Sequence, residues 1–426
     1  PIQRLVDIVS SVFVPTVIAI SIITFIIWAI FGPDPAMAFA IVNAVAVLII
    51  ACPCALVIST PVSIVASLAA SARNGVLIKG GAYVEAPSRL TALAMDKTGT
   101  ITMGEPEVAG LHPLGGTAER DLLSAAVALE ARSSHPLARA ILARGERDGL
   151  KQSAATDTQT VPGRGVEGTW EGQPVWLGSD RFATEKGLGE AIPRDLLERI
   201  EGAGSTLVAV GSGSRLLGLI ELRDRIRPDA KGVVARLHAQ GVQKIIMLTG
   251  DNERTARAVA AEVGIDEVRA ELLPEDKVAA IEELVASYDV VAMIGDGVND
   301  APAMARAHFA IAMGAVGSDA AIETADIALM TDDIAKVPWL IGHSRRTMNV
   351  IHQNIAIALA TKALFVGLTA FGMATMWGAI AADVGVSLLV VANALRLLRA
   401  TTDRPDPSGG EKIGEKMAQG ALAHGH

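Results

Sequence analysis

The side chains best suited to phosphate chemistry stand in three polar strings, each directly after a short apolar run. Residues 96–100 are Asp-Lys-Thr-Gly-Thr, residues 249–252 are Thr-Gly-Asp-Asn, and residues 295–302 are Gly-Asp-Gly-Val-Asn-Asp-Ala-Pro. Short apolar runs bounded by turn residues are typical of buried strands. We therefore expect the three strings to follow three strands and to meet at one end of a sheet.

The first string offers a nucleophile, and the third offers ligands for a cation. The Asp96 carboxylate can attack the terminal phosphate of ATP and form an aspartyl phosphate. Asp296 and Asp300 are carboxylates of the kind that Mg²⁺ prefers. Lys277 follows a helix-start signal, Pro-Glu-Asp, and could balance phosphate charge. Each string alone could be an ordinary polar strand end, but the three together favour phosphoryl transfer.

A second kind of chemistry is suggested by the two cysteines of the chain, Cys52 and Cys54, which flank Pro53 inside an apolar segment. Free cysteines are often just small buried residues. Proline, however, removes a helix hydrogen bond and distorts the helix, which can turn both sulfurs toward one cavity. Thiolates favour Zn²⁺, Cu⁺ and similar ions. We expect no disulfide between such close neighbours and predict that both sulfurs bind a metal ion.

Lys362 and Asp383 stand inside two later apolar segments. Ionisable side chains are expensive within a membrane and usually functional. One interpretation is a structural ion pair. The alternative is that Asp383 joins Cys52 and Cys54 as an oxygen ligand, while Lys362 balances charge in the empty site. Two thiolates with a carboxylate suit a divalent ion such as Zn²⁺ or Cd²⁺ better than Cu⁺.

These groups must be positioned by both membrane and soluble elements. Half of the residues are hydrophobic, and the net charge of -9 sits mainly in the middle of the chain. Residues 11–31, 36–60, 351–372 and 376–398 are apolar runs long enough to span a bilayer. Basic residues stand at the ends away from the short connections: Arg4, Arg73, Lys79, Arg345, Arg346, Arg396 and Arg399. The positive-inside rule then predicts a multi-pass protein of the cell membrane with both termini and the central region in the cytoplasm.

The central region contains two parts that differ in residue composition and pattern. Residues 224–335 alternate apolar runs with helical patterns, which predicts a doubly wound α/β domain completed by the strand before Asp96. Residues 108–222 are richer in Gly and Ser and indicate an inserted α+β domain. The sequence contains no Gly-x-x-x-x-Gly-Lys-Ser/Thr loop, so ATP would not be bound in the P-loop manner.

The strings at 96–100 and 295–302 resemble the motifs of the P-type ATPases, and the resemblance covers nearly the whole chain. It implies a phosphorylation domain of haloacid-dehalogenase-like fold. It implies Mg²⁺ bound by Asp96, Thr98, Asp296 and Asp300. Related phosphatases carry an acid–base Asp where this chain has Thr98, so the aspartyl phosphate should persist. The catalytic residues implied are Asp96, Lys97, Thr98, Thr249, Gly250, Asp251, Lys277 and Asn299.

The inserted domain resembles the nucleotide-binding domain of the heavy-metal branch, class IB. The resemblance rests on Ser-His-Pro-Leu at 134–137 and Gly-Arg-Gly at 163–165. It implies that His135 orients adenine with Glu130 nearby. Gly163 and Gly165 lack a Cβ and would let the backbone approach the nucleotide closely.

The metal motifs are similar to those of the zinc, cadmium and lead exporters. Cys52, Cys54, Asp383 and Lys362 match that pattern, whereas the Tyr-Asn pair and the Met-Ser-Ser region of copper-type members are not found. The predicted function is ATP-driven export of Zn²⁺, Cd²⁺ or Pb²⁺ through an aspartyl phosphate. The alternatives are a Cu⁺-transporting member or an inactive fragment of such a pump.

The predicted division of the chain has six parts. Residues 1–65 hold two membrane helices with Cys-Pro-Cys, and 66–107 a connector with the first part of the phosphorylation domain. Residues 108–222 form the nucleotide-binding domain, and 223–336 the second part of the phosphorylation domain. Residues 337–400 hold two membrane helices, and 401–426 form a disordered tail.

Members of the family have further segments before the first apolar run of this sequence, which begins at Pro1. The sequence also contains no Thr-Gly-Glu string. We expect a carboxy-terminal portion without the actuator domain and the first membrane helices. Its expected partners are the lipid bilayer, metal ions and the missing amino-terminal portion, with no nucleic acid. Alone it should bind ATP and label itself slowly without moving metal. A membrane-tethered phosphatase, disfavoured by Thr98, and a non-catalytic metal-binding fragment are the other interpretations.

Overall fold

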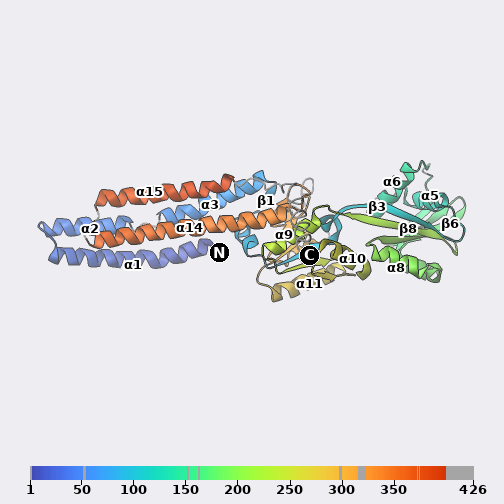
Figure 1. The fold of residues 1–426 in the computed structure, drawn as a ribbon, viewed down its shortest axis with the longest axis horizontal. Helices are drawn as coiled ribbons and strands as arrows, with labels where there is room; N and C mark the ends of the chain where they lie inside the picture. The colour runs from blue at the N-terminus through green and yellow to red at the C-terminus, as the bar shows by residue number, and fades with distance from the viewer. Residues whose placement is uncertain are drawn as a thin grey trace, which may run out of the picture. The chain divides into compact units, whose positions relative to one another are not determined.

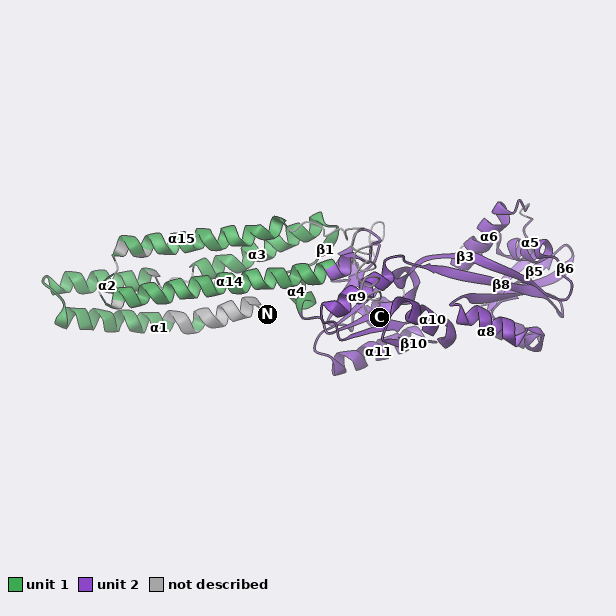
Figure 2. Cartoon of the chain, in the orientation of Figure 1, with its two compact units in different colours: residues 1–88, 339–426 green, residues 89–338 purple. Residues whose placement is uncertain are grey.

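The computed structural model describes residues 2–50, 54–133, 135–150, 153–161, 164–296, 300–314, 323–371, 373 and 375–399. The chain divides into two compact units, which Figure 2 colours separately. Unit 1 comprises residues 1–88 and 339–426, and unit 2 comprises residues 89–338. The finer six-part division along the chain stays a prediction.

Unit 1 is built from long apolar helices. Among the described residues, Ala36–Arg73, Lys336–Thr369 and Ile380–Arg399 are long and apolar enough to cross a membrane, and Pro15–Phe31 is a shorter apolar helix. These stretches correspond to the four predicted spans. The helices are α1 (Ile2–Phe31), α2 (Ala36–Ile50), α3 (Cys54–Arg73), α14 (Lys336–Ala370) and α15 (Met376–Leu395). The short elements are β1 (Val76–Ile78), α4 (Ala82–Glu85), η1 (Ala86–Arg89) and η4 (Arg396–Arg399).

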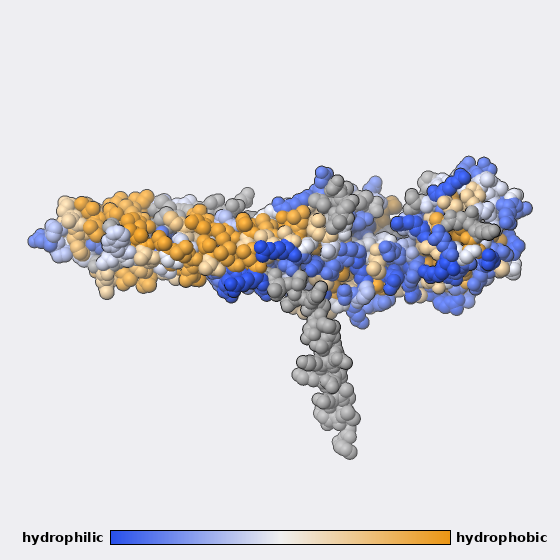
Figure 3. Space-filling model, turned by 90° about the horizontal axis from the view of Figure 1, so that it is seen from above, coloured by the Kyte–Doolittle hydropathy of each residue, from blue (hydrophilic) through white to orange (hydrophobic). Residues whose placement is uncertain are grey.

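The outer surface of these helices is apolar, as the orange side chains over unit 1 in Figure 3 show. Ile30 is 68% exposed and Trp377 is 76% exposed, and similar side chains recur along α1, α2, α14 and α15. Exposed apolar patches of this extent mark an interaction surface. The surface is therefore suited to contact lipid tails.

Hydroxyl groups join the helices of unit 1 where they meet. Ser21 Oγ of α1 donates to the Ala44 carbonyl of α2 at 2.9 Å. Ser67 Oγ of α3 lies 2.9 Å from His343 Nε2 of α14. The helix that starts at Cys54 continues to Arg73, beyond the span predicted to end at residue 60. The second half of this helix is less hydrophobic than the first, but it buries small and hydroxyl side chains against α14. This packing keeps the segment helical beyond the apolar run.

A parallel sheet forms the centre of the predicted doubly wound domain in unit 2. Its strands stand in the order β13-β12-β11-β2-β9-β10, and the pairs between them are parallel. The strands are β2 (Ala92–Asp96), β9 (Lys244–Leu248), β10 (Glu267–Arg269), β11 (Val291–Gly295), β12 (Phe309–Ala312) and β13 (Ile327–Leu329). All residues of β2 and β11 are buried, as expected for a sheet covered on both faces.

Helices connect these strands. Residues of α11 and α12 pack with one face of β2, β9, β11 and β12 in a single apolar cluster. Together with the parallel strand order, this arrangement confirms the predicted doubly wound α/β domain. The helices are α9 (Ala230–Ala239), α10 (Glu253–Val263), α11 (Pro274–Ser287) and α12 (Ala301–Met304).

A second, antiparallel sheet forms the inserted domain, between β2 and α9 in the chain. Its order is β3-β8-β7-β6-β5-β4, and Figure 1 shows the long strands β3 and β8 side by side. The strands are β3 (Thr102–Pro113), β4 (Thr156–Val161), β5 (Gly165–Trp170), β6 (Gln173–Gly178), β7 (Thr206–Ser212) and β8 (Arg215–Ile226). The helical elements are α5 (Glu119–Glu130), α6 (Pro136–Arg147), α7 (Asp180–Glu185), η3 (Gly189–Ala191) and α8 (Arg194–Gly202).

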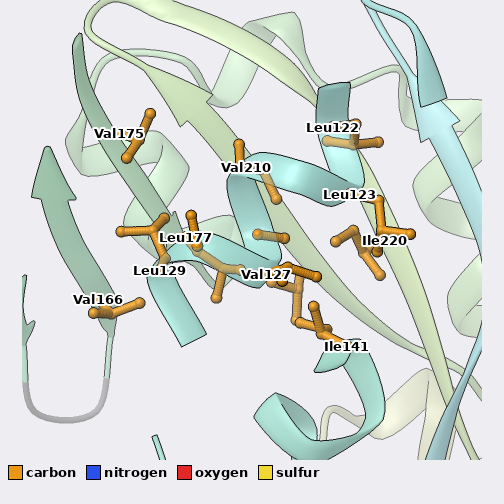
Figure 4. Packing of buried hydrophobic residues seen from close by; sticks show 14 of the residues in the cluster. Leu122, Leu123, Val127, Leu129, Ile141, Val166, Val175, Leu177, Val210 and Ile220 are labelled. Atoms are coloured by element: carbon orange, nitrogen blue, oxygen red, sulfur yellow. The ribbon is translucent and has the colours of Figure 1, made fainter. Parts of the chain in front are cut away.

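Helix α5 packs its apolar face on this sheet. Figure 4 shows Leu123 beside Ile220, with Val127, Leu129 and Val210 in the same apolar cluster. These five side chains are at most 2% exposed, so the inserted domain has an apolar core of its own. The predicted insertion of an α+β domain into the doubly wound domain is thus confirmed.

Candidate functional sites

The carboxyl ends of β2, β9 and β11 bring the three polar strings to one edge of the parallel sheet. Asp96, the last residue of β2, pairs in register with Leu248, the residue before Thr249. On the other side, Met95 pairs with Ile294, two residues before Asp296. Parallel strands in register deliver the residues after them to the same place, which is the arrangement that the strings predicted.

A lysine lies between two carboxylates at this edge. Lys277 Nζ donates to Asp96 Oδ1 at 2.6 Å and to Asp300 Oδ1 at 2.7 Å. Asp96 is 7% exposed and Asp300 is 2% exposed. Gly295 leaves room for Asp300, because a Cβ there would lie 2.8 Å from its Oδ2 atom. Lys277 comes from the first turn of α11, whose Asp276 side chain accepts from the backbone N–H of Leu273 at 2.9 Å.

The electrostatics of this group follow from burial and from like charge. Burial and the neighbouring Asp300 raise the pKa of Asp96 from 3.8 to about 6, although Lys277 opposes the shift. Asp296 adds to the same rise, so its charge is also felt at Asp96. Burial disfavours the Lys277 ammonium, but Asp96 and Asp300 outweigh burial and hold its pKa above the ordinary value. Neutral pH lies above the pKa of Asp96, so this carboxyl is mainly ionised there.

The donor set fits Mg²⁺ by its chemistry. Asp96, Asp296 and Asp300 provide carboxylate oxygens, and the one ammonium of Lys277 is shared between Asp96 and Asp300. In the part of the chain that the structure describes, no three His, Cys, Asp or Glu side chains are already arranged around a metal position. Asn299, predicted to be catalytic, lies outside the described residues.

The loops beside Asp96 contain the remaining predicted catalytic residues. Lys97 Nζ donates to Asp251 Oδ2, which joins the first string to the second. Thr249 is 3% exposed, and its Oγ1 accepts from the Asp251 N–H at 3.1 Å. Thr98 is exposed at the start of η2 (Lys97–Ile101), and Gly250 is exposed after β9. The structure therefore pairs Lys97 with Asp251 and Lys277 with Asp96.

Two contacts at this loop involve residues that the sequence did not single out. Thr102 Oγ1 lies 2.5 Å from Asp224 Oδ2 and 3.0 Å from the Lys97 carbonyl oxygen, so its single proton is shared between two acceptors. Arg227 donates to the carbonyls of Gly99 and Thr100. No local motif identifies Asp224 or Arg227, because both stand more than a hundred residues away along the chain. Asp224 lies at the end of β8 and Arg227 directly after it, where the chain returns from the inserted domain. Only this position could have suggested a role for them.

The inserted domain contains a cavity of about 360 Å³ lined by residues of β4, β5, β6, β7 and α6. Glu130, His135 and Gly165 all line it. Glu130 ends α5 and is 8% exposed, and burial raises its pKa above the ordinary value. His135 is the N-cap of α6, where its Nδ1 accepts from the Leu137 N–H at 3.3 Å. Of the four residues predicted around the nucleotide, the three that the structure describes line one cavity.

Gly165 has a structural role as well. A Cβ at Gly165 would lie 2.0 Å from the Leu177 carbonyl oxygen, on the neighbouring strand β6. Its register partner Gly178 is equally restricted, because a Cβ there would lie 2.5 Å from the Arg164 carbonyl oxygen. The missing Cβ of Gly165 therefore lets two strands approach each other beside the cavity. Gly163 lies outside the described residues.

In unit 1, Lys362 Nζ donates to Asp383 Oδ1 at 3.0 Å, between α14 and α15. The two side chains are 7% and 21% exposed, and a small cavity of about 10 Å³ lies beside them. Cys54 does not line this cavity, but its neighbour Ala55 packs against Ala358 and Val390 of the same two helices. The start of α3 and the Lys362–Asp383 pair are therefore close in the fold.

The cysteine pair differs from the expectation. Cys54 is disulfide-bonded in the structure, and the other cysteine of the chain, Cys52, lies outside the described residues. The prediction that such close neighbours stay unlinked is wrong for this structure. A disulfide sulfur is not a thiolate ligand, so any metal chemistry of this pair belongs to the reduced protein.

The chain is similar to a family model and to several known proteins. Residues 90–308 match the family model "haloacid dehalogenase-like hydrolase". A probable cadmium-transporting ATPase of Staphylococcus aureus (strain MRSA252) is 40% identical over 404 residues, 94% of this chain and 56% of that protein. A copper-transporting P-type ATPase of Rhizobium leguminosarum bv. viciae is 43% identical over 404 residues, 93% of this chain and 48% of that protein.

A solved structure extends the match to the arrangement in space. The crystal structure of a zinc-transporting PIB-type ATPase in the E2.Pi state superposes with a TM-score of 0.76 at 39% identity. The match covers 93% of this chain and 66% of that chain. The chain spans about half the length of the curated relatives it matches.

Proposed function

We propose that this chain, which belongs to the haloacid dehalogenase-like metal-transporting P-type ATPases, provides the catalytic and ion-binding portion of an ATP-driven exporter of divalent metal ions. The observation that carries the proposal is the Asp96–Lys277–Asp300 group at the edge of the parallel sheet. An ionised carboxylate, held beside a lysine and further carboxylates, is suited to attack a phosphate that a cation partly neutralises.

In the proposed step, an oxygen of Asp96 forms a bond to the γ-phosphorus of ATP. The bond from that phosphorus to the bridging oxygen breaks, and ADP leaves with the electron pair. Asp96, Thr98, Asp296 and Asp300 would hold Mg²⁺, which when bound neutralises charge on the phosphate oxygens. Lys277, already bonded to Asp96, is placed to balance the incoming phosphate charge. Lys97, Thr249, Gly250, Asp251 and Asn299 would complete the phosphate-binding loops.

Thr98 determines the fate of the product. A related phosphatase would use a carboxylate at this position to activate water, and a threonine side chain is a poor base. The aspartyl phosphate of this chain should therefore be long-lived, which suits a cycle in which phosphorylation drives a conformational change.

The cavity of the inserted domain is the proposed ATP site. It is large enough for a nucleotide base and is lined by both apolar and polar groups, as ligand cavities usually are. His135 and Glu130 would contact the adenine, and the backbone at Gly163 and Gly165 would approach it closely. Both the cavity and the phosphorylation site are proposed to face the cytoplasm.

For the transported ion, the proposed ligands are the reduced Cys52 and Cys54 with Asp383, and Lys362 replaces the ion in the empty site. The Lys362–Asp383 hydrogen bond supports this interpretation, because an ammonium already neutralises the carboxylate there. Zn²⁺, Cd²⁺ or Pb²⁺ are the proposed ions. The similarity to a copper transporter favours Cu⁺ as a second candidate.

Labelling of the purified chain tests the catalytic proposal. With Mg²⁺ and ATP labelled at the γ-phosphate, we expect an acid-stable, hydroxylamine-sensitive label that is absent from Asp96→Asn. Full labelling of the Asp96→Asn protein would falsify the assignment of the nucleophile.

Metal analysis under reducing conditions tests the ion. Asp383→Ala should lower the amount of bound Zn²⁺ while leaving ATP binding intact. X-ray absorption that shows a site of two or three sulfur ligands around Cu⁺, unaffected by Asp383→Ala, would favour the copper alternative. The proposed activity of the complete pump is stimulation by divalent ions with little response to Cu⁺.

A further inference from the structure

Arg227 lies where the chain leaves the inserted domain, one residue after β8. Its side chain is buried, with 7% of the residue exposed. The guanidinium Nε donates to the Thr100 carbonyl oxygen at 2.9 Å, and Nη2 donates to the Gly99 carbonyl oxygen at 2.9 Å. The backbone N–H of Arg227 donates in addition to the Ile101 carbonyl at 3.0 Å. Three successive carbonyls of the loop after Asp96 are therefore bound by one residue.

The other side of the guanidinium is bound by Asp332. Nη1 donates to the Asp332 carbonyl oxygen at 2.9 Å, and Nη2 lies 2.7 Å from each of its carboxylate oxygens. Asp332 stands between β13 and α14 in the chain. Arg227 thus connects three segments: the strand from the inserted domain, the loop after Asp96 and the segment that precedes α14.

The loop needs such a partner. Gly99 adopts φ +74°, and the backbone of Thr98 is extended, so η2 is not a regular turn that satisfies its own carbonyls. Buried carbonyls need donors. Arginine offers five donors in a planar fork, whereas the ammonium of lysine is a point charge that cannot reach the same acceptors in one plane.

We propose that Arg227 is a positioning residue for phosphoryl transfer, which holds the loop of residues 97–101 so that Asp96 and Thr98 face the phosphate. The inference rests on the proposed function of Asp96. Among the described residues, Arg227 makes no hydrogen bond to the carboxylate of Asp96; it acts through the carbonyls of Gly99 and Thr100. Small displacements of reacting groups cost about a hundredfold in rate, so the loss of its fork should slow the chemical step.

Nucleotide binding should be unaffected. The cavity that contains Glu130 and His135 is lined by residues 130–208 and includes neither Arg227 nor the loop that it binds. A positioning role therefore predicts that the maximal rate of Asp96 labelling falls while the half-saturating ATP concentration stays constant. A role in folding alone would lower both the amount of active protein and ATP binding together.

The experiment measures single-turnover labelling of the full chain over a range of ATP concentrations for Arg227→Ala and Arg227→Lys. We expect Arg227→Ala to lower the maximal rate by about ten- to a hundredfold, with less than about a twofold change in half-saturating ATP. Methylguanidinium added to Arg227→Ala should restore part of the rate. The matched control is Arg225→Ala, because Arg225 is an exposed arginine at the end of the same strand.

The possible outcomes separate a positioning role of Arg227 from a role in folding. A wild-type rate in Arg227→Ala overturns the proposal, and so does a full rate in Arg227→Lys together with no response to methylguanidinium. If Arg227→Ala does not fold, Arg227→Lys decides: a parallel loss of labelling and ATP binding overturns the positioning role. An unlabelled wild-type chain would instead overturn the proposed function, and this inference with it.

Discussion

Two lysine–aspartate groups, one in each unit, have a similar electrostatic role on different scaffolds. In unit 2, Lys277 lies between Asp96 and Asp300 at distances of 2.6 and 2.7 Å, at the edge of a parallel sheet. In unit 1, Lys362 lies 3.0 Å from Asp383, between two helices. Lys277 neutralises carboxylates that are buried, and Lys362 neutralises one that is half-buried; either carboxylate without its partner would be costly.

The difference lies in the balance of charge. The group of unit 2 has more carboxylates than ammonium groups and retains negative charge, so a cation can be added to it. The pair of unit 1 is balanced, so a cation would have to displace the ammonium of Lys362. We infer that the first group is built to keep a cation during chemistry and the second to exchange one.

The scaffolds also differ. At the sheet edge, strand register and the first turn of α11 fix the carboxylates and the lysine. In unit 1 the register of α14 against α15 depends on side chains: Asn354 Nδ2 donates to the Val390 carbonyl at 3.2 Å, and Asn393 Nδ2 donates to Asn354 Oδ1 at 2.8 Å. Backbone hydrogen bonds position one site, and amide side chains help to position the other.

The largest effect is expected from the loss of the bridging lysine in unit 2. Lys277→Met should lower the rate of Asp96 labelling by about a hundred- to a thousandfold, because one preorganised charge at the phosphate is lost. The measurement is single-turnover labelling at saturating ATP. Lys231→Met, at an exposed lysine of α9, is the control and should remain within about twofold of wild type. Equal rates for both variants would show that Lys277 does not act at the phosphate.

Loss of the lysine in unit 1 should instead act on stability. Lys362→Met leaves the half-buried Asp383 without this partner. The free energy of unfolding should fall by about 3 kcal/mol, the lower end of the cost of breaking a buried ion pair, because Asp383 is 21% exposed. Combining Lys362→Met with Asp383→Leu should recover most of that loss, since neither charge then remains. Unfolding in detergent micelles by denaturant measures both variants, and Leu364→Met, at an exposed position of α14, serves as control. A double variant as unstable as Lys362→Met would contradict the pairing.

A smaller loss is expected at the amide contacts that fix the two helices. Asn354 is fully buried, so Asn354→Ala removes its bonds to Val390 and Asn393 and should cost about 1–3 kcal/mol. Asn349→Ala, at an exposed position of the same helix, should change stability by less than about 0.5 kcal/mol. If the two variants unfold alike, the register of α14 and α15 does not depend on these amides.

The mildest effect concerns pH dependence in the inserted domain. Burial raises the pKa of Glu130 above its ordinary value of 4.5, so its carboxylate becomes protonated at a higher pH than an exposed glutamate. If the carboxylate accepts a hydrogen bond from the base, ADP binding is strongest above that raised pKa and weakens as pH falls through it. We expect a loss of about five- to tenfold, the worth of one such hydrogen bond.

Calorimetric titration of ADP between about pH 7.5 and about pH 5 measures this dependence. Glu130→Gln should reduce it, because the amide does not titrate in this range. Glu119→Gln changes an exposed residue at the other end of α5 and should keep the wild-type profile. A Glu130→Gln protein with an unchanged profile would exclude Glu130 as its source.

Much of the fold could be predicted from the sequence. Apolar runs of two different lengths separated strands from membrane helices, and the polar strings after residues 95, 248 and 294 marked one edge of a sheet. These predictions depend on neighbouring residues only, because hydrophobic period and strand-end chemistry are local properties. The confirmed doubly wound domain, its insertion and the apolar helices all belong to this class.

Contacts between residues far apart along the chain could not be predicted from the sequence and required the tertiary structure. The bridge of Lys277 from Asp96 to Asp300, the fork of Arg227 at Gly99 and Thr100, and the close approach of Gly165 to β6 have no local signature. The extension of α3 to Arg73 was likewise decided by its packing on α14 and not by hydropathy. A sequence can state which side chains are capable of the chemistry, but burial and long-range packing decide which of them meet, because the distance between two residues in space is not set by their separation in the chain.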